Sequence, residues 1–106
     1  MTDYVQVLTT AASEQEARQI CDTLVENRLA ACVQVAGPVS STYRWQGKVE
    51  REQEWQCLAK TETRLYSEVE AVIRGIHSYD EPEIVAIPIL AGSPGYLAWI
   101  SDSVGE

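Results

Sequence analysis

The chain has 106 residues, with 8 Lys and Arg residues against 16 Asp and Glu residues, and its formal net charge is −8. This acidity argues against nucleic acid and anionic membranes as partners, because both bind proteins largely through Lys and Arg. Hydrophobic residues make up 45% of the sequence, which argues against a disordered tail. We expect one domain over residues 1–106, small enough that a partner copy would help to bury its apolar surface.

The cysteines and the lack of a long apolar run indicate a cytoplasmic protein. Cys21, Cys32 and Cys57 contain no Cys-x-x-Cys pair, so neither a zinc ribbon nor a thioredoxin-like redox pair is predicted. Such cysteines are most often small buried hydrophobes. No stretch approaches the roughly 20 apolar residues of a membrane span, and the first residues lack the pattern of a signal peptide.

The first two predicted elements are a strand over residues 4–9 and a helix behind it. Ser13 and Glu16 are typical of a capping box, in which the Ser side chain meets the N3 amide and the Glu side chain reaches back. The helix is expected to end near Asn27–Arg28. Its apolar stripe is expected to contain Ala17, Ile20, Cys21, Leu24 and Val25.

A long hairpin is predicted next. Residues 29–35 and 40–45 favour a strand interrupted at Gly37–Pro38, and Gln46–Lys48 is typical of a tight turn. The return strand, residues 49–61, would span about 40 Å at roughly 3.3 Å per residue.

The last three predicted elements are a helix, a strand and a short terminal helix. A helix is expected over about residues 63–76, with Gly75 as a plausible C′ residue near its end. A strand follows over residues 83–89, whose Pro88 predicts an edge position or a bulge. A short terminal helix covers residues 96–100.

The order β-α-β-β-α-β plus a C-terminal helix predicts an α+β, ferredoxin-like fold with an antiparallel sheet and helices on one face. The second helix is only about 20 Å long at 1.5 Å per residue, so two such helices cannot cover the extended hairpin. Its far end carries Tyr43, Trp45 and Trp55, large rings that gain most from burial. We therefore expect another copy of the chain to pack on the hairpin and the bare sheet face.

The polar residues of the sequence are compatible with three kinds of site. His77 is the only histidine, and because no nucleophile elbow or Gly-rich phosphate loop occurs, hydrolysis is disfavoured. His77, Asp80 and Glu83 with a thiolate are candidate ligands of copper or zinc. The third interpretation is a polar pocket. The alternative is that the same residues form only a solvated charged face with an ordered turn. The candidate residues are Trp45, Glu54, Lys60 and Tyr79.

Four groups of motifs run along nearly the whole chain. They are Arg28-Leu-Ala-Ala-Cys-Val33, Tyr43-Arg-Trp-Gln-Gly-Lys48 with Glu54 and Lys60-Thr61, His77-Ser-Tyr-Asp-Glu-Pro-Glu-Ile84 with Pro88, and Tyr96-Leu-Ala-Trp-Ile100. Taken together, these motifs resemble the CutA family of divalent-cation tolerance proteins.

The resemblance implies a cytoplasmic homotrimer of ferredoxin-like subunits, arranged like PII-type signal proteins, with no established reaction. It implies tolerance of copper and other divalent cations, with no metal needed for folding. It also implies a ligand pocket at clefts between subunits, formed by Cys32, Trp45, Glu54, Lys60, His77, Tyr79 and Glu83.

Copper binding in some CutA members is assigned to a Cys in the first strand and a His-His pair after the second helix. This sequence has Thr9 and Ile76–His77 at those positions. Only His77 remains, so a metal would need Cys32, Glu83 or residues of another copy as further ligands. The alternative function is a PII-like small-molecule sensor or protein-interaction adaptor with no metal role.

Overall fold

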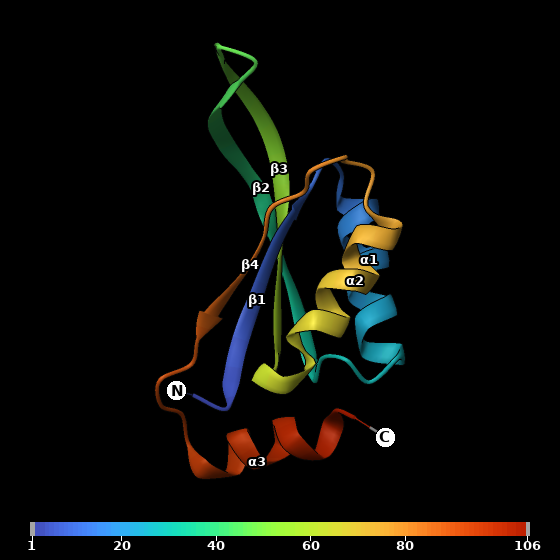
Figure 1. The fold of residues 1–106 in the computed structure, drawn as a ribbon, viewed down its shortest axis with the longest axis vertical. Coiled ribbons are helices and arrows are strands. Elements are labelled where there is room, and N and C mark those ends of the chain that lie inside the picture. The colour runs from blue at the N-terminus through green and yellow to red at the C-terminus, as the bar shows by residue number, and fades with distance from the viewer. Residues whose placement is uncertain (1, 106) are drawn as a thin grey trace.

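The computed structural model describes residues 2–105 and shows an α+β fold in which two helices cover one face of a sheet (Figure 1). The antiparallel sheet has the order β2-β3-β1-β4. Its strands are β1 (Tyr4–Ala11), β2 (Cys32–Trp45), β3 (Lys48–Glu62) and β4 (Ile84–Pro88). The helices are α1 (Glu14–Glu26), α2 (Tyr66–Ile76), preceded by the 3-10 turn η1 (Thr63–Leu65), and α3 (Pro94–Ser103). The predicted α+β class and antiparallel sheet are confirmed.

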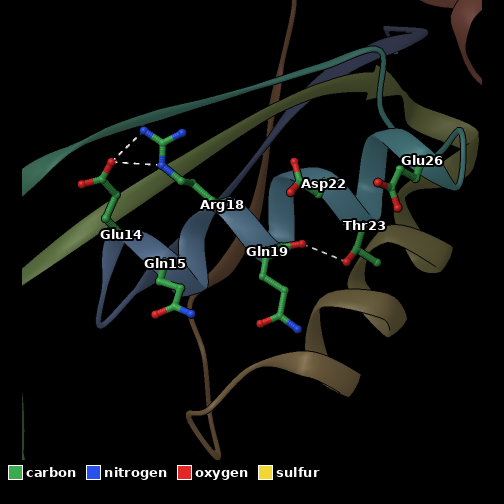
Figure 2. A pocket seen from close by; sticks show the side chains of 7 residues that line it. All are labelled: Glu14, Gln15, Arg18, Gln19, Asp22, Thr23 and Glu26. Atoms are coloured by element: carbon green, nitrogen blue, oxygen red, sulfur yellow. Dashed lines mark hydrogen bonds and ion pairs between the residues drawn. The ribbon is translucent and has the colours of Figure 1, made fainter.

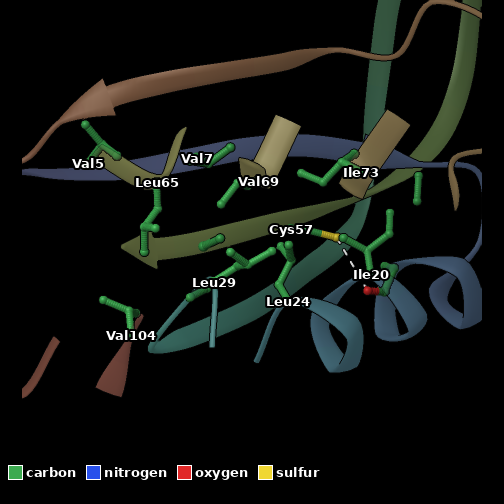
Figure 3. Packing of buried hydrophobic residues seen from close by; sticks show 14 residues of the cluster. Val5, Val7, Ile20, Leu24, Leu29, Cys57, Leu65, Val69, Ile73 and Val104 are labelled. Atoms are coloured by element: carbon green, nitrogen blue, oxygen red, sulfur yellow. Dashed lines mark hydrogen bonds between the residues drawn. The ribbon is translucent and has the colours of Figure 1, made fainter. Parts of the chain in front are cut away.

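The core lies between the sheet and the layer formed by α1 and α2 (Figure 3). Ile20 and Leu24 of α1 and Val69 and Ile73 of α2 are at most 1% exposed, because apolar residues three and four positions apart share one helix face. Alternate residues of β1 and β3 point at these helices, since side chains alternate along a strand. None of the helices within residues 2–105 is long and apolar enough to cross a membrane.

Helix α1 differs from the prediction in its capping box and in the width of its buried stripe. Ser13 caps its N-terminus and accepts a hydrogen bond from the Glu16 backbone N–H at 3.1 Å, but the Glu16 side chain does not reach back. Its carboxylate instead accepts hydrogen bonds from the backbone N–H and the hydroxyl of Ser78, at 2.8 and 3.0 Å. Val25 is 44% exposed, so the buried stripe is narrower than predicted.

The β2-β3 hairpin projects beyond the helices (Figure 1), and the molecule measures 44 × 25 × 22 Å. Its turn residues Gln46 and Gly47 have φ of 49° and 80°, the left-handed pair that a tight hairpin turn requires. A register shift falls between Ala36 and Val39, at the predicted interruption.

The second half of the chain departs from the prediction at three boundaries. Helix α2 begins at Tyr66 because the 3-10 turn precedes it, and Gly75 lies inside α2, which is capped by His77. Helix α3 has 10 residues and is longer than predicted. The edge position expected from Pro88 is confirmed, since β4 is an outer strand.

The sheet face opposite α1 and α2, called here the open face, is covered by neither of these two helices (Figure 1). Val85 and Ile87 of β4 pair with Leu8 and Gln6 on this face and are 44% and 46% exposed. Trp45, on the same face at the hairpin tip, is 55% exposed. The domain thus leaves large apolar side chains in water on one side.

Candidate functional site

A cleft of about 780 Å³ lies between the open face of the β2-β3 hairpin and the segment of residues 77–83 that joins α2 to β4. The hairpin supplies its floor and one wall, and the 77–83 segment supplies the other wall. The lining residues are Thr10, Ser41, Thr42, Tyr43, Trp45, Glu50, Glu52, Glu54, Ser78, Tyr79, Asp80, Glu81 and Glu83.

The cleft is strongly acidic because of strand alternation. Glu50, Glu52 and Glu54 follow one another at every second position of β3, so their side chains share one face. Asp80, Glu81 and Glu83 add carboxylates from the opposite wall, and no Lys, Arg or His stands among the described residues that line the cleft. Such a concentration of one charge sign in a concave site attracts cations.

Glu54 is the most buried acid of the cleft, at 8% exposed. Its Oε2 accepts a hydrogen bond from the Tyr79 hydroxyl at 2.9 Å. Burial, followed by the hydrogen bond to Glu54 and the charge of that carboxylate, raises the pKa of Tyr79 well above its usual range. Within residues 2–105 no cationic side chain forms an ion pair with Glu54, although buried charges are normally paired.

His77 lies behind the cleft with a side chain that is 0% exposed. Its Nε2 lies 2.7 Å from the backbone oxygen of Thr10, and its Nδ1 accepts a hydrogen bond from the Tyr79 backbone N–H at 3.1 Å. These two contacts assign the proton to Nε2, which donates to Thr10 in the neutral ring. Both nitrogens are therefore engaged, and a metal ion would have to displace one of these hydrogen bonds.

Cys32 and Lys60 lie away from the cleft, at the other end of the β2-β3 pair. They face each other across β2 and β3, four residues along β3 from Gln56, which pairs with Thr10. This separation is about 13 Å at roughly 3.3 Å per residue. Lys60 donates to the Gln34 side chain at 2.8 Å.

The structure thus brings four of the seven predicted pocket residues together: Trp45, Glu54, Tyr79 and Glu83. His77 adjoins them, whereas Cys32 and Lys60 do not line the cleft of a single chain. Across residues 2–105, no three His, Cys, Asp or Glu side chains are grouped closely enough to hold a metal ion. The predicted pair of metal ligands, His77 and Cys32, does not form a site within one chain.

A second depression, of about 750 Å³, runs along the outer face of α1 (Figure 2). All of its lining residues come from this one helix, and they point into solvent. Arg18 and Glu14 pair there at 2.7 Å, with side chains 69% and 52% exposed. Such a surface pair contributes little to stability, and the depression has no opposing wall that would enclose a ligand.

Known proteins are similar to this chain in both sequence and fold. The family described as "CutA1 divalent ion tolerance protein" matches residues 5–103. The divalent-cation tolerance protein CutA of Thermus thermophilus is 44% identical over 99 residues, which cover 93% of this chain and 96% of that protein. The solved structure of the Thermus thermophilus protein superposes with a TM-score of 0.94, at 43% identity, covering 96% of this chain and 99% of that one.

The chain belongs to the CutA family. The Mus musculus protein CutA is 36% identical over 91 residues, which cover 86% of this chain and 51% of the mouse protein. The chain therefore spans about half the length of that relative. The CutA match includes both walls of the cleft, from Thr10 to Glu83. The family and the Thermus thermophilus relative are named for tolerance of divalent cations and not for a reaction.

Sequence reasoning missed much of the acidic floor of the cleft. Glu50, Glu52 and Tyr43 line the cleft beside Glu54, but of these four residues the sequence predicts only Glu54 as a site residue. The even spacing from Glu54 back along the strand was visible and could have predicted Glu50 and Glu52. Thr10 gave no such signal, because its place in the cleft depends on how β1 meets the 77–83 segment.

Proposed function

We propose that this chain is one subunit of a CutA-type homotrimer that acts in metal homeostasis in the cytoplasm. The trimer binds copper, another heavy-metal ion or a small effector in clefts between subunits, and it catalyses no reaction. The observation that carries this proposal is the acidic cleft next to an uncovered sheet face, with the buried Glu54 that no cationic side chain within residues 2–105 pairs with.

Assembly is supported by the apolar residues of the open face. Val85, Ile87 and Trp45 are each between 44% and 55% exposed, and burying the exposed half of such a side chain contributes roughly 1 kcal/mol, about half of the gain from complete burial. A second copy that packs on this face would bury them. It would also bring further side chains to the cleft. Three copies are what the resemblance to the CutA family implies.

Cation binding is supported by the charge of the cleft and by the state of Glu54. A buried carboxylate without a cationic partner lowers its energy when a cation binds beside it. Because the residues of one chain do not form a closed metal site, a bound metal ion takes donors from more than one subunit. The carboxylates of Glu54 and Glu83 are the donors that this chain offers.

The test is calorimetric titration with copper(II), with zinc and with a nucleotide, on the wild type and on single variants. Glu54→Gln is expected to weaken copper(II) binding by at least roughly tenfold, because a desolvated ion pair is worth more than about 1.4 kcal/mol. Glu68→Gln is the matched control, since it removes one charge from an exposed position of α2 outside the cleft. Equal affinity of Glu54→Gln, Glu68→Gln and wild type contradicts the cleft as the cation site.

His77→Ala separates the cleft from direct ligation by the histidine. If His77 only positions Tyr79, the variant keeps saturable copper(II) binding with reduced affinity, whereas a ligand role predicts complete loss. Nucleotide binding without metal binding would support the alternative PII-like sensor. The acidic lining opposes that outcome, because phosphate groups are anionic.

A further inference from the structure

Two thiols meet on the helix-covered side of the sheet, away from the cleft. Cys57 lies in β3, is 1% exposed, and its Sγ donates a hydrogen bond to the backbone oxygen of Ala17 at 3.6 Å (Figure 3). Cys21 follows Ala17 by one turn of α1 and packs against the core cluster that contains Cys57. In the i to i+4 pattern of a helix, the backbone oxygen of Ala17 also faces the amide of Cys21, so the Cys57 thiol lies beside the turn of α1 that carries Cys21. Neither thiol has a part in the proposed cation site.

The close approach of α1 to β3 follows from the small residue between them. Ala17 is 0% exposed, and its methyl group allows the helix backbone to lie within hydrogen-bond reach of a β3 side chain. A larger side chain at position 17 would hold the two elements apart. Cys21 and Cys57 therefore approach each other through packing, although 36 positions separate them in the chain.

The two thiols differ in access and in acidity. Cys21 is half-buried, whereas Cys57 is buried, so an oxidant in solution reaches Cys21 first. The hydrogen bond with Cys57 lowers the pKa of Cys21 below its usual range. The same hydrogen bond, together with burial, raises the pKa of Cys57 far above its usual range. Cys21 is thus the better nucleophile, because the thiolate is the reactive form.

We propose that Cys21 and Cys57 form a hydroperoxide-reactive thiol pair that closes to an intramolecular disulfide joining α1 to β3. The Cys21 thiolate attacks one peroxide oxygen and breaks the O–O bond. Sulfenic acid forms at Cys21, and the departing hydroxide takes up a proton and leaves as water. The Cys57 thiol then attacks the Cys21 sulfur, its proton passes to the departing hydroxide, and a second water leaves as the S–S bond forms.

The apolar surroundings favour a disulfide over a soft metal ion at this pair. Two thiolates around one monovalent copper ion would leave a negative charge in the core, whereas a disulfide is neutral. Cys32 is the natural internal control. It is also half-buried, but it starts β2 opposite Lys60, on the open face of the sheet.

The experiment treats the reduced, full-length protein with hydrogen peroxide, counts the free thiols and maps disulfides by peptide mass spectrometry. The wild type has three free cysteines and is expected to lose two of them, with Cys21 joined to Cys57 inside one chain. Cys32→Ser is expected to lose both of its thiols at the wild-type rate. Cys21→Ser and Cys57→Ala are expected to form no intramolecular disulfide.

A sulfenic-acid trapping reagent tests the assigned roles. In Cys57→Ala the reagent is expected to label Cys21, because the resolving thiol is gone. Labelling of Cys32 alone, a disulfide that includes Cys32, or oxidation of Cys21 to sulfinic acid beside a free Cys57 in the wild type would each overturn the proposal. If Cys57→Ala does not fold, Cys57→Ser is treated with the same reagent. Labelling of Cys21 is again the expected result.

Discussion

His77, Tyr79 and Glu54 form a chain of hydrogen bonds that fixes one wall of the cleft. His77 binds the Thr10 backbone oxygen and the Tyr79 amide, and the Tyr79 hydroxyl reaches Glu54. Because the His77 side chain is fully buried and both of its nitrogens are engaged, it acts here as a tether between the 77–83 segment and β1. In the proposed cation site, the group that attracts the cation is Glu54, which Tyr79 holds through its hydrogen bond.

Tyr79→Phe is expected to lower the free energy of unfolding by about 1–2 kcal/mol at pH 7, because a hydrogen bond to a buried carboxylate is lost. The folded pKa of Tyr79 is raised above its unfolded value. The contribution of this tyrosine is therefore fully present below about pH 10, the ordinary tyrosine pKa, and is lost as the pH rises through the folded pKa.

Urea unfolding of wild type and Tyr79→Phe at pH 7 and at pH 11 checks this expectation. The difference between the two proteins should shrink at the higher pH. Tyr96→Phe is the control, since Tyr96 is 41% exposed on α3. A difference that stays constant with pH would contradict the assigned hydrogen bond.

Thr9 carries the one buried side-chain polar atom, within residues 2–105, that has no hydrogen-bond partner. Thr9→Val replaces the hydroxyl with a methyl group of similar size and is expected to stabilise the protein by about 1 kcal/mol. Thr61→Val is the matched control, because the Thr61 hydroxyl is also buried but donates to the Leu29 backbone oxygen at 2.7 Å. Thermal unfolding should give shifts of opposite sign for the two variants.

At the scale of elements, the N-terminus of α1 holds the 77–83 segment. The Glu16 carboxylate binds Ser78 through two hydrogen bonds and lies 3.5 Å from Nδ1 of His77. A segment outside helix and strand thus takes its position from a rigid helix, as functional loops commonly do. The cleft depends on this contact because the segment supplies its second wall.

Glu16→Ala is expected to release the 77–83 segment from α1. Hydrogen exchange at the Ser78 amide should become faster, and the free energy of unfolding should fall by about 1–2 kcal/mol, because hydrogen bonds to a charged group are lost. Glu14→Ala removes a carboxylate from the same first turn of α1 that pairs only with the exposed Arg18. It should leave the Ser78 amide unchanged, and equal acceleration in both variants would contradict the tether.

At the scale of the whole molecule, one sheet face is packed and the other is open. Helices α1 and α2 bury one face, while Val85, Ile87 and Trp45 remain exposed on the other. Exposed apolar groups of this size in a small domain indicate a partner surface. The β2-β3 hairpin, which carries Trp45, extends beyond the helices and the rest of the domain (Figure 1).

Ile87→Glu is expected to dissociate the proposed trimer, because a charged side chain would have to be buried at the interface. Sedimentation should give about three times the chain mass of 11.8 kDa for the wild type and the mass of one chain for the variant. Val25→Glu is the control, since Val25 is 44% exposed on α1, away from the open face. A wild-type monomer at micromolar concentration would contradict the assembly.

The order of strands and helices, the edge position of Pro88 and the membership in the CutA family could be predicted from the sequence. These properties depend on local periodicity, on turn chemistry and on motifs that stand close together in the chain. The boundaries were less accurate, because the 3-10 turn before α2 and the helical state of Gly75 reflect packing in addition to residue preference.

The partners of individual polar and thiol groups were decided only by the tertiary structure. Glu16 was expected to cap its own helix but binds Ser78, which lies 62 positions away. Glu54 becomes buried, His77 becomes a tether, and Cys21 meets Cys57, because packing of α1 and α2 on the sheet brings distant segments together. A side chain's residue type sets which bonds it can make, and the fold sets which groups stand within reach.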